Sequence, residues 1–403
     1  MKQKKILIVG SGRWQLHLIK AAKAAGLYVI NTNLYEDSVG FRFADVGLAV
    51  DIYDLEKHVA IGREYGIDAV VTDQIDIAVP TAAYVAEQLG LPGIGSVVAE
   101  RFTNKARMRE FCRNSGTVQP RYCCCESLVE AVDAGSTLGY PVVVKPTQNR
   151  SSRGVFRVHS AAELAAALPQ TLANSRERRF LVEEYIGGVE LSVEGLKTSK
   201  THVVLGCATK EHFGHNAMLD RRVVYPKDDR TIPYAELARI HDGLIAAAGL
   251  PFGVTHAEYK YWQGTFYLIE CAARGGGANI SSHIIPLVSG IDATGALIRM
   301  ALGEPLRGVA PLPQDKAAIL EFLAFAPGRV RSIRGVEKVR SMPNVVDFDL
   351  NFKEGDTLSL PADGASRAGH FIAHAHSDRA LESICDEVRD SLTIEYEPEH
   401  SPL

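Results

Sequence analysis

Residues 255–277, with the sequence THAEYKYWQGTFYLIECAARGGG, predict two strands joined by a tight turn at Gly264. A three-residue loop centred on Gly264 would place Glu258 directly opposite Glu270 on one face of the hairpin. Cross-strand Cβ atoms are about 5 Å apart, and like charges at that separation repel each other unless a cation lies between them. A hard cation such as Mg²⁺ binds oxygen ligands and keeps substrate phosphates in its shell. We therefore expect Glu258 and Glu270 to hold a metal ion.

The alternative is two solvated acids on an open face, but the apolar neighbours of Glu270 predict a half-buried strand. If repulsion dominates, the Glu270→Gln variant should melt no lower than the parent protein without metal. Arg274 follows four residues after Glu270 and precedes three glycines, where backbone can approach a ligand closely. A cation at this position could hold a transferring phosphate, although an isolated arginine beside glycines is more often structural.

The strand PVVVKP ends at Lys145 and leads into a polar loop that contains Ser151, Ser152 and Gly154. An ammonium group, hydroxyl groups and backbone N–H groups together suit the binding of a triphosphate. A lysine that extends to solvent beside a surface loop fits the same pattern. Residue types alone do not separate these two interpretations.

The segment LVEEYIGGVE, residues 181–190, carries Glu183 and Glu190 on either side of a Gly-Gly turn. One acid could accept a hydrogen bond from an adenine amino group, and the other could accept from ribose hydroxyls. Two solvated acids that flank a hairpin turn are an equally compatible reading of this segment.

The N-terminal part of the chain predicts a parallel, doubly wound α/β arrangement. A strand at Lys5–Val9, glycines at 10 and 12 and a helix over residues 15–25 open an alternation of strands and helices. Gln15 stands where the third glycine of a G-x-G-x-x-G motif would be, so a tight turn is favoured over a dinucleotide site. From about residue 180 the pattern changes to a largely antiparallel sheet with one helix near Tyr234–Ala248.

Composition excludes several classes of partner. The 403 residues include 44 basic and 48 acidic ones, which gives a formal net charge of −4 and no strong field for nucleic acid or anionic lipid. No signal-peptide core and no apolar run of about 18 residues is present, so we expect a cytoplasmic protein without membrane contact. The seven cysteines are odd in number, and a large cytosolic domain needs no disulfides, so free thiols are expected. Residues 123–125 alternate faces if extended and cannot all ligate one metal.

Taken in order, these motifs resemble the ATP-grasp superfamily over about residues 100–280, and SSRG is similar to the loop of D-alanine:D-alanine ligases. The sequence IECAARGGG is most similar to the amino-acid ligase and carboxylate–amine ligase branch. The resemblance implies a Rossmann-like pre-ATP-grasp domain at 1–98, an ATP-grasp domain at 99–308 with a lid at about 116–188, and a small α+β C-terminal domain at 309–403.

The resemblance also implies a set of site residues. Phosphates would be contacted by Lys105, Lys145 and the loop with Ser151, Ser152 and Gly154. Adenine would be held by Glu183 and by the backbone of Glu184 and Ile186. Ribose would be bound by Glu190, and Mg²⁺ or Mn²⁺ would be carried by Glu258 and Glu270. The sequence departs from the pattern at Ala272, where many members have Asn. One metal site is therefore expected to be held more weakly.

The implied reaction is ATP-dependent formation of an amide or peptide bond through an acyl phosphate, with release of ADP and phosphate. Lys145 and Arg274 would be catalytic, the carboxylate and amine substrates would be small molecules such as amino acids, and a homodimer is compatible with the sequence. A phosphoribosylglycinamide-synthetase-like or bicarbonate-using enzyme is an alternative. A non-catalytic nucleotide-binding regulatory protein is another, although the intact acids and cations argue against it.

Overall fold

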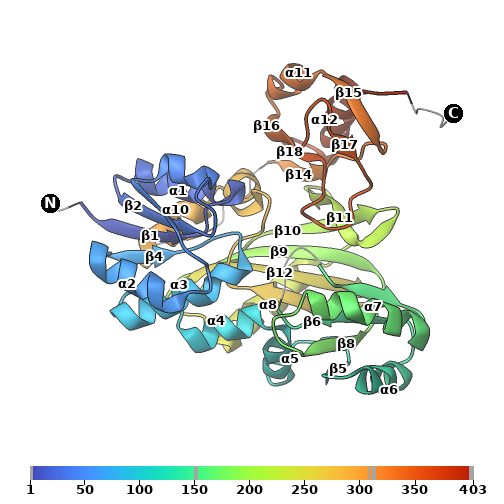
Figure 1. Cartoon of the computed structure of the whole chain (residues 1–403), viewed down its shortest axis with the longest axis horizontal. Coiled ribbons are helices and arrows are strands. Elements are labelled where there is room, and N and C mark those ends of the chain that lie inside the picture. Colours follow the sequence, from blue (N-terminus) through green and yellow to red (C-terminus); the bar gives the residue numbers. More distant parts are fainter. Residues whose placement is uncertain (1–2, 149–152, 307–308, 311–314, 399–403) are drawn as a thin grey trace.

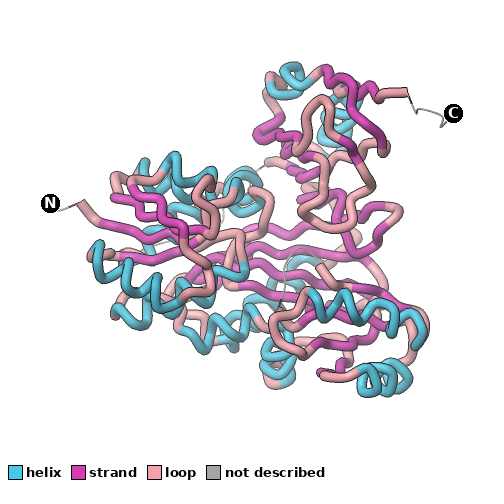
Figure 2. Tube along the Cα trace, in the orientation of Figure 1, coloured by secondary structure: helices cyan, strands magenta, loops and turns pink. Residues whose placement is uncertain are grey.

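The computed structural model describes residues 3–148, 153–306, 309–310 and 315–398, and Ser151 and Ser152 lie outside them. A long central sheet joins an N-terminal α/β unit, a smaller lid-like unit and a C-terminal α+β region (Figure 1). Figure 2 shows that the strands of the central sheet run between the helices of the N-terminal unit and those of the lid-like unit.

The N-terminal unit is a parallel sheet in the order β3-β2-β1-β4, as the alternation of strands and helices predicts. Its strands are β1 (Lys5–Val9), β2 (Tyr28–Asn33), β3 (Val46–Ala49) and β4 (Ala69–Val71), and its helices are α1 (Leu16–Ala24), α2 (Leu55–Tyr65) and α3 (Val79–Leu89). Alternate residues of β1 pack against α1 and α10 (Ala293–Ala301) on one face and against α2 and α3 on the other. The Gln15 side chain donates to the Asp73 carbonyl and accepts from the Gly12 N–H, so it fills the turn after β1.

The central sheet has the order β13-β12-β9-β10-β11-β14-β18-β16 and is antiparallel throughout. Its first strands are β9 (Val189–Lys197), β10 (His202–Phe213), β11 (Asn216–Tyr225), β12 (Gly253–Trp262) and β13 (Thr265–Ala272). The apolar face of β9 and β12, which carries residues such as Leu191 and Tyr259, packs against α8 (Tyr234–Ala248). The intervening residues of both strands place acids and bases on the opposite face.

The lid-like unit is a second antiparallel sheet in the order β5-β8-β6-β7. Its elements are β5 (Tyr122–Cys125), α6 (Leu128–Leu138), β6 (Val142–Pro146), β7 (Phe156–Val158), α7 (Ala161–Ala173) and β8 (Phe180–Glu184). Two helices precede it, α4 (Ser96–Thr103) and α5 (Lys105–Arg113), and the Asn104 side chain caps α5. All seven cysteines are free thiols, as predicted.

The C-terminal region extends the central sheet with β14 (Ala317–Phe322), β16 (Val345–Leu350) and β18 (Gly369–Ala375). A small sheet of β15 (Gly328–Arg334), β17 (Thr357–Leu358) and β19 (Thr393–Tyr396), with α11 (Val336–Arg340) and α12 (Asp378–Ser391), completes it. Among the described residues no single helix passes the length and hydropathy test for a membrane span, and only the pair Ile280–Ser289 and Ala293–Ala301, bent by 113°, passes it together.

Candidate active site

The hairpin of β12 and β13 places Glu258 directly opposite Glu270, as predicted, but by a different route. The expected three-residue loop is wrong: Trp262 pairs with Thr265 across a two-residue turn, whose φ values of 49° and 80° suit a type I′ turn. A β-bulge between Glu258 and Tyr259 then shifts the register by one residue and brings the two acids opposite each other.

Each acid of this pair faces its own lysine. Lys105 Nζ lies 2.8 Å from Glu270 Oε1, and Lys210 Nζ lies 2.5 Å from Glu258 Oε1. Burial lowers the pKa of Lys105, but the Glu270 carboxylate outweighs burial, so the pKa is raised. Glu270 therefore has a cationic partner in the structure, and this contact argues against the expectation that Glu270→Gln melts no lower than the parent without metal. The opposed carboxylates still offer the oxygen donors that a hard divalent cation prefers.

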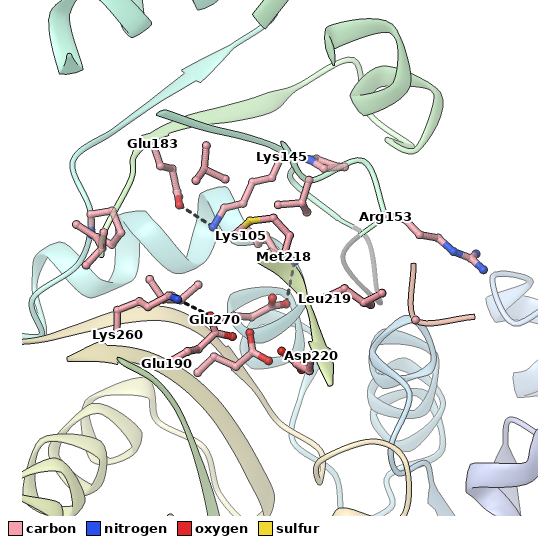
Figure 3. Close-up of a pocket in the computed structure, with 18 of the residues that line it drawn as sticks. Lys105, Lys145, Arg153, Glu183, Glu190, Met218, Leu219, Asp220, Lys260 and Glu270 are labelled. Carbon is pink, nitrogen blue, oxygen red and sulfur yellow. Dashed lines mark hydrogen bonds and ion pairs between the residues drawn. The ribbon is translucent and has the colours of Figure 1, made fainter. Parts of the chain in front are cut away.

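Glu183 holds Lys145 in place. The Arg109 guanidinium contacts the Glu183 carboxylate at 2.7 and 3.2 Å. Lys145 Nζ contacts the same carboxylate at 2.6 Å (Figure 3). Burial would raise the pKa of Glu183, but these two cations outweigh it and bring the pKa to about 2. Both oxygens of the Glu183 carboxylate therefore contact cations. The sequence analysis assigned Glu183 to adenine and did not predict these ion pairs.

Glu190 is the centre of a second charged cluster on the floor of the pocket. Its carboxylate lies 2.7 Å from Lys260 Nζ and 3.3 Å from His212 Nε2. Glu190, His212 and Asp220 bring their ligand atoms within 4.8 Å of one another, the spacing of a metal site. Lys210 Nζ lies 3.4 Å from Glu190 and 3.1 Å from Asp220, so a cation already occupies this cluster.

Arg274 is tied to the N-terminal unit rather than left open to a ligand. Its Nε and one terminal nitrogen each donate to the Asp76 carboxylate at 2.8 Å, and its other terminal nitrogen donates to the Gly275 carbonyl at 2.9 Å. Burial raises the pKa of Asp76, but Arg274 outweighs it and lowers the pKa overall. Asp76 follows β4 in the N-terminal unit and lies almost 200 residues before Arg274 in the sequence. The local sequence pattern around Arg274 therefore could not predict this ion pair.

His256 is a further residue that the sequence reasoning missed. Its Nδ1 contacts Glu194, whose other oxygen accepts the Gly276 N–H at 2.9 Å. Burial lowers the pKa of His256, but Glu194 outweighs burial and raises it to about 9. A Cβ on Gly276 would lie 2.4 Å from Glu194 Oε1, so this glycine is needed for close packing. The alternation along β9 and β12 was the available signal, since residues 256, 258 and 260 share a face.

One pocket collects most of the predicted residues. It is lined by Lys105, Lys145, Glu183, Glu184, Ile186, Glu190, Glu258, Glu270 and Arg274, and also by Asp76, Arg153, Asp220, His256, Lys260, Gly364 and Arg367, which were not predicted. Gly154, with φ of 70°, lies beside the pocket, where an added Cβ would meet Asn174 and Pro146. The Glu184 N–H donates to the Arg121 carbonyl, whereas the Ile186 N–H has no partner within the described part of the chain.

The acid stability of the protein should depend on Glu183. A carboxyl group whose pKa falls from 4.5 to about 2 on folding stabilises the protein above pH 4.5 and loses this contribution as pH falls towards 2. The contribution is on the order of 3 kcal/mol. We expect Glu183→Gln to lower the melting temperature at pH 7 and to flatten its pH dependence between pH 4.5 and 2.

Thermal unfolding followed by circular dichroism at several pH values would measure this effect. The solvent-exposed Glu64 on α2 provides a control, and Glu64→Gln should follow the parent profile. A Glu183→Gln profile parallel to that of the parent would contradict the assignment.

Two family models match this chain. Residues 138–282 match the family described as ATP-grasp domain, and residues 321–397 match the family described as L-amino acid ligase C-terminal domain 2. The uncharacterized protein y4rH of Sinorhizobium fredii is 24% identical over 342 residues, which cover 84% of this chain and 70% of that protein.

Solved structures share the whole architecture. An L-amino acid ligase from Bacillus licheniformis has a TM-score of 0.85 at 24% identity, with 99% of this chain and 100% of that chain covered. The biotin carboxylase domain of the Hydrogenobacter thermophilus 2-oxoglutarate carboxylase, in complex with MgADP, ADP and bicarbonate, has a TM-score of 0.76 at 18% identity, with 97% and 90% covered. At these identities the likeness shows a common fold.

Proposed function

We propose that this chain, a member of the ATP-grasp superfamily, is an ATP-dependent carboxylate–amine ligase that acts through an acyl phosphate. The two family matches confirm the superfamily and the fold class that the sequence predicts. The observation that carries the proposal is the pocket itself, in which Lys105, Lys145 and Arg274 surround the opposed Glu258 and Glu270. Such a set of cations and acids suits the transfer of a phosphoryl group.

The nucleotide would lie between the two sheets. The N–H of Ile186, which has no partner among the described residues, is suited to donate to adenine, and the carbonyl of Glu184 could accept from its amino group. Glu190, whose pKa is lowered to about 2, is an ionised acceptor for the ribose hydroxyls. We assign the Glu183 side chain to the positioning of Lys145 and leave adenine to the backbone beside it.

Glu258 and Glu270 would hold the divalent metal, which would offset the negative charge of the phosphates when bound. Their lysine partners, Lys210 and Lys105, hold the two carboxylates in place on the sheet. Lys105 lies at the start of α5 and is buried, so it can contact a phosphate only at this pocket.

The reaction would proceed in two steps. A carboxylate oxygen attacks the γ-phosphorus of ATP, and the bond between this phosphorus and the β-phosphate oxygen breaks. The products of this step are ADP and an acyl phosphate. The amine nitrogen then attacks the carbonyl carbon, loses a proton, and inorganic phosphate leaves with one oxygen of the original carboxylate. Arg274, which Asp76 fixes in orientation, would stabilise the oxyanion of the tetrahedral intermediate.

Amino acids are the substrates that we propose, and the match of residues 321–397 to the L-amino acid ligase C-terminal domain supports this choice. A bicarbonate-using or phosphoribosylglycinamide-synthetase-like reaction is the alternative, because one of the solved structures with this fold contains bicarbonate. A screen of phosphate release with paired amino acids, bicarbonate and phosphoribosylamine would separate these alternatives.

The acyl-phosphate step can be tested with a carboxylate substrate labelled with ¹⁸O. Because the acyl phosphate leaves with an oxygen of the acid, one label should appear in inorganic phosphate, and the nucleotide product should be ADP. Mass spectrometry of phosphate and chromatography of the nucleotides would measure both. Formation of AMP and pyrophosphate, or unlabelled phosphate during amide formation, would contradict the mechanism. ATP binding without turnover for any pair would favour a regulatory protein.

A further inference from the structure

The lysines and arginines that line the pocket are paired with carboxylates, with one exception in the described part of the chain. The pairs are Lys105–Glu270 at 2.8 Å, Lys145–Glu183 at 2.6 Å, Arg153–Asp363 at 3.3 Å, Lys260–Glu190 at 2.7 Å and Arg274–Asp76 at 2.8 Å. Arg367, which lines the same pocket, has no carboxylate within 4 Å among the described residues.

Arg367 belongs to the C-terminal region and is held by apolar and backbone contacts. Its guanidinium lies 3.6 Å from the ring centroid of Phe322 in β14, and one terminal nitrogen donates to the Asp220 carbonyl at 2.8 Å. Its Nε is buried and has no hydrogen-bond partner within the described ranges. Burial lowers the pKa of Arg367, and the more distant charges of Asp220 and Asp363 do not compensate for it.

The loop that carries Arg367, residues 361–367, is anchored to the rim of the pocket. His215 Nε2 lies 2.9 Å from the Pro361 carbonyl, and Asn216 Nδ2 donates to the Ala362 carbonyl at 3.2 Å. Asp363 accepts the N–H groups of Ala365 and Ser366 and pairs with Arg153 of the lid-like unit. The loop therefore has a defined conformation that directs Arg367 towards the pocket from the C-terminal side.

A cation that is removed from water without a counter-ion costs stability, unless an anion joins it. A guanidinium with free donors offers the planar fork that binds carboxylate or phosphate with two hydrogen bonds. Arg367 lines a pocket whose ligands, under the proposed function, are both anionic. The arrangement matches an anion site that is completed by the ligand.

We propose that Arg367 is an oxyanion-binding residue of the active site, through which the C-terminal region contacts either the substrate carboxylate or a phosphate of the nucleotide. The inference rests on the proposed function for the identity of these two anions. It makes the C-terminal region a wall of the active site rather than only an extension of the sheet.

The test compares Arg367→Met, which removes the charge at similar length, with Arg367→Lys and with Arg331→Met, a change of an exposed arginine on β15. Binding of the Mg²⁺ complex of the non-hydrolysable analogue AMP-PNP is measured by calorimetry, and KM for the carboxylate substrate is measured by phosphate release. We expect Arg367→Met either to weaken AMP-PNP binding or to raise the carboxylate KM by at least tenfold. Arg367→Lys should have a smaller effect on the same quantity, and Arg331→Met should change neither quantity.

The two arms identify the anion. Weaker AMP-PNP binding would assign Arg367 to a phosphate, and a raised carboxylate KM with unchanged AMP-PNP binding would assign it to the substrate carboxylate. Unchanged values in both arms would overturn the proposal. If the parent protein binds AMP-PNP but never releases phosphate, the proposed function fails while the proposal for Arg367 remains testable. Calorimetry then decides alone, and unchanged AMP-PNP binding by Arg367→Met would overturn the role of Arg367. If Arg367→Met does not fold, Arg367→Lys decides, and parent-like values for it would overturn the proposal.

Discussion

Glu270→Gln is expected to lower ATP-dependent phosphate release by at least about two orders of magnitude, because it removes one of the two opposed carboxylates that would hold the metal. The same variant should melt at a lower temperature than the parent without metal. Lys105 is buried and pairs with Glu270 at 2.8 Å, so loss of the carboxylate charge leaves a buried ammonium group with less compensation.

Both effects can be measured on one preparation, by coupled assay of phosphate and by thermal unfolding in the presence of a chelator. Glu110→Gln, at an exposed position on the same helix as Lys105, serves as the control and should retain activity. Near-normal turnover with unchanged metal dependence would exclude Glu270 as a metal ligand. An unchanged melting temperature would show that Lys105 does not depend on Glu270.

Asp76→Asn is expected to reduce phosphate release about a hundredfold and to destabilise the protein by about 3 kcal/mol. The side chain of Asp76 fixes Arg274 through two hydrogen bonds of 2.8 Å, and removal of one partner from this largely buried ion pair leaves a poorly compensated charge. A misdirected Arg274 would also lose its contact with the developing oxyanion, a contact that typically contributes a factor of about 10² to 10³.

Denaturant unfolding and steady-state kinetics would test this prediction, with Asp37→Asn as an exposed control in the same N-terminal unit. We expect the Asp76→Asn effect to appear mainly in kcat, because a group that acts on the transition state alters turnover more than ground-state binding. A variant with reduced stability but parent-like kcat would assign the pair a purely structural role.

The sequence predicts elements well where the pattern is local. The helix expected near Tyr234–Ala248 is α8 with the same bounds, and the pair of Glu258 and Glu270 is found as expected. Strand β11 was not predicted, because its charged residues interrupt the alternation that identifies a half-buried strand.

The partners of the predicted site residues could not be read from local pattern. Arg109, Lys210 and Asp76 each lie far along the chain from the residue that they contact, and their pairing depends on how separate units pack. Individually each resembles an ordinary surface charge in the sequence. The same reason explains why the positioning role of Glu183 was not expected, since its two cations come from α5 and β6.

The bulge beside Glu258 also bears on how such a hairpin can diverge. The eleven residues between Glu258 and Glu270 are one too many for a two-residue turn with regular pairing, and the surplus residue lies at the bulge. The same eleven residues with a three-residue turn and no bulge would bring the acids together equally well. Mutational drift can therefore slide the surplus residue along the hairpin without loss of the acid pair, and deletion of that residue would leave ten residues, which a two-residue turn with regular pairing also accommodates.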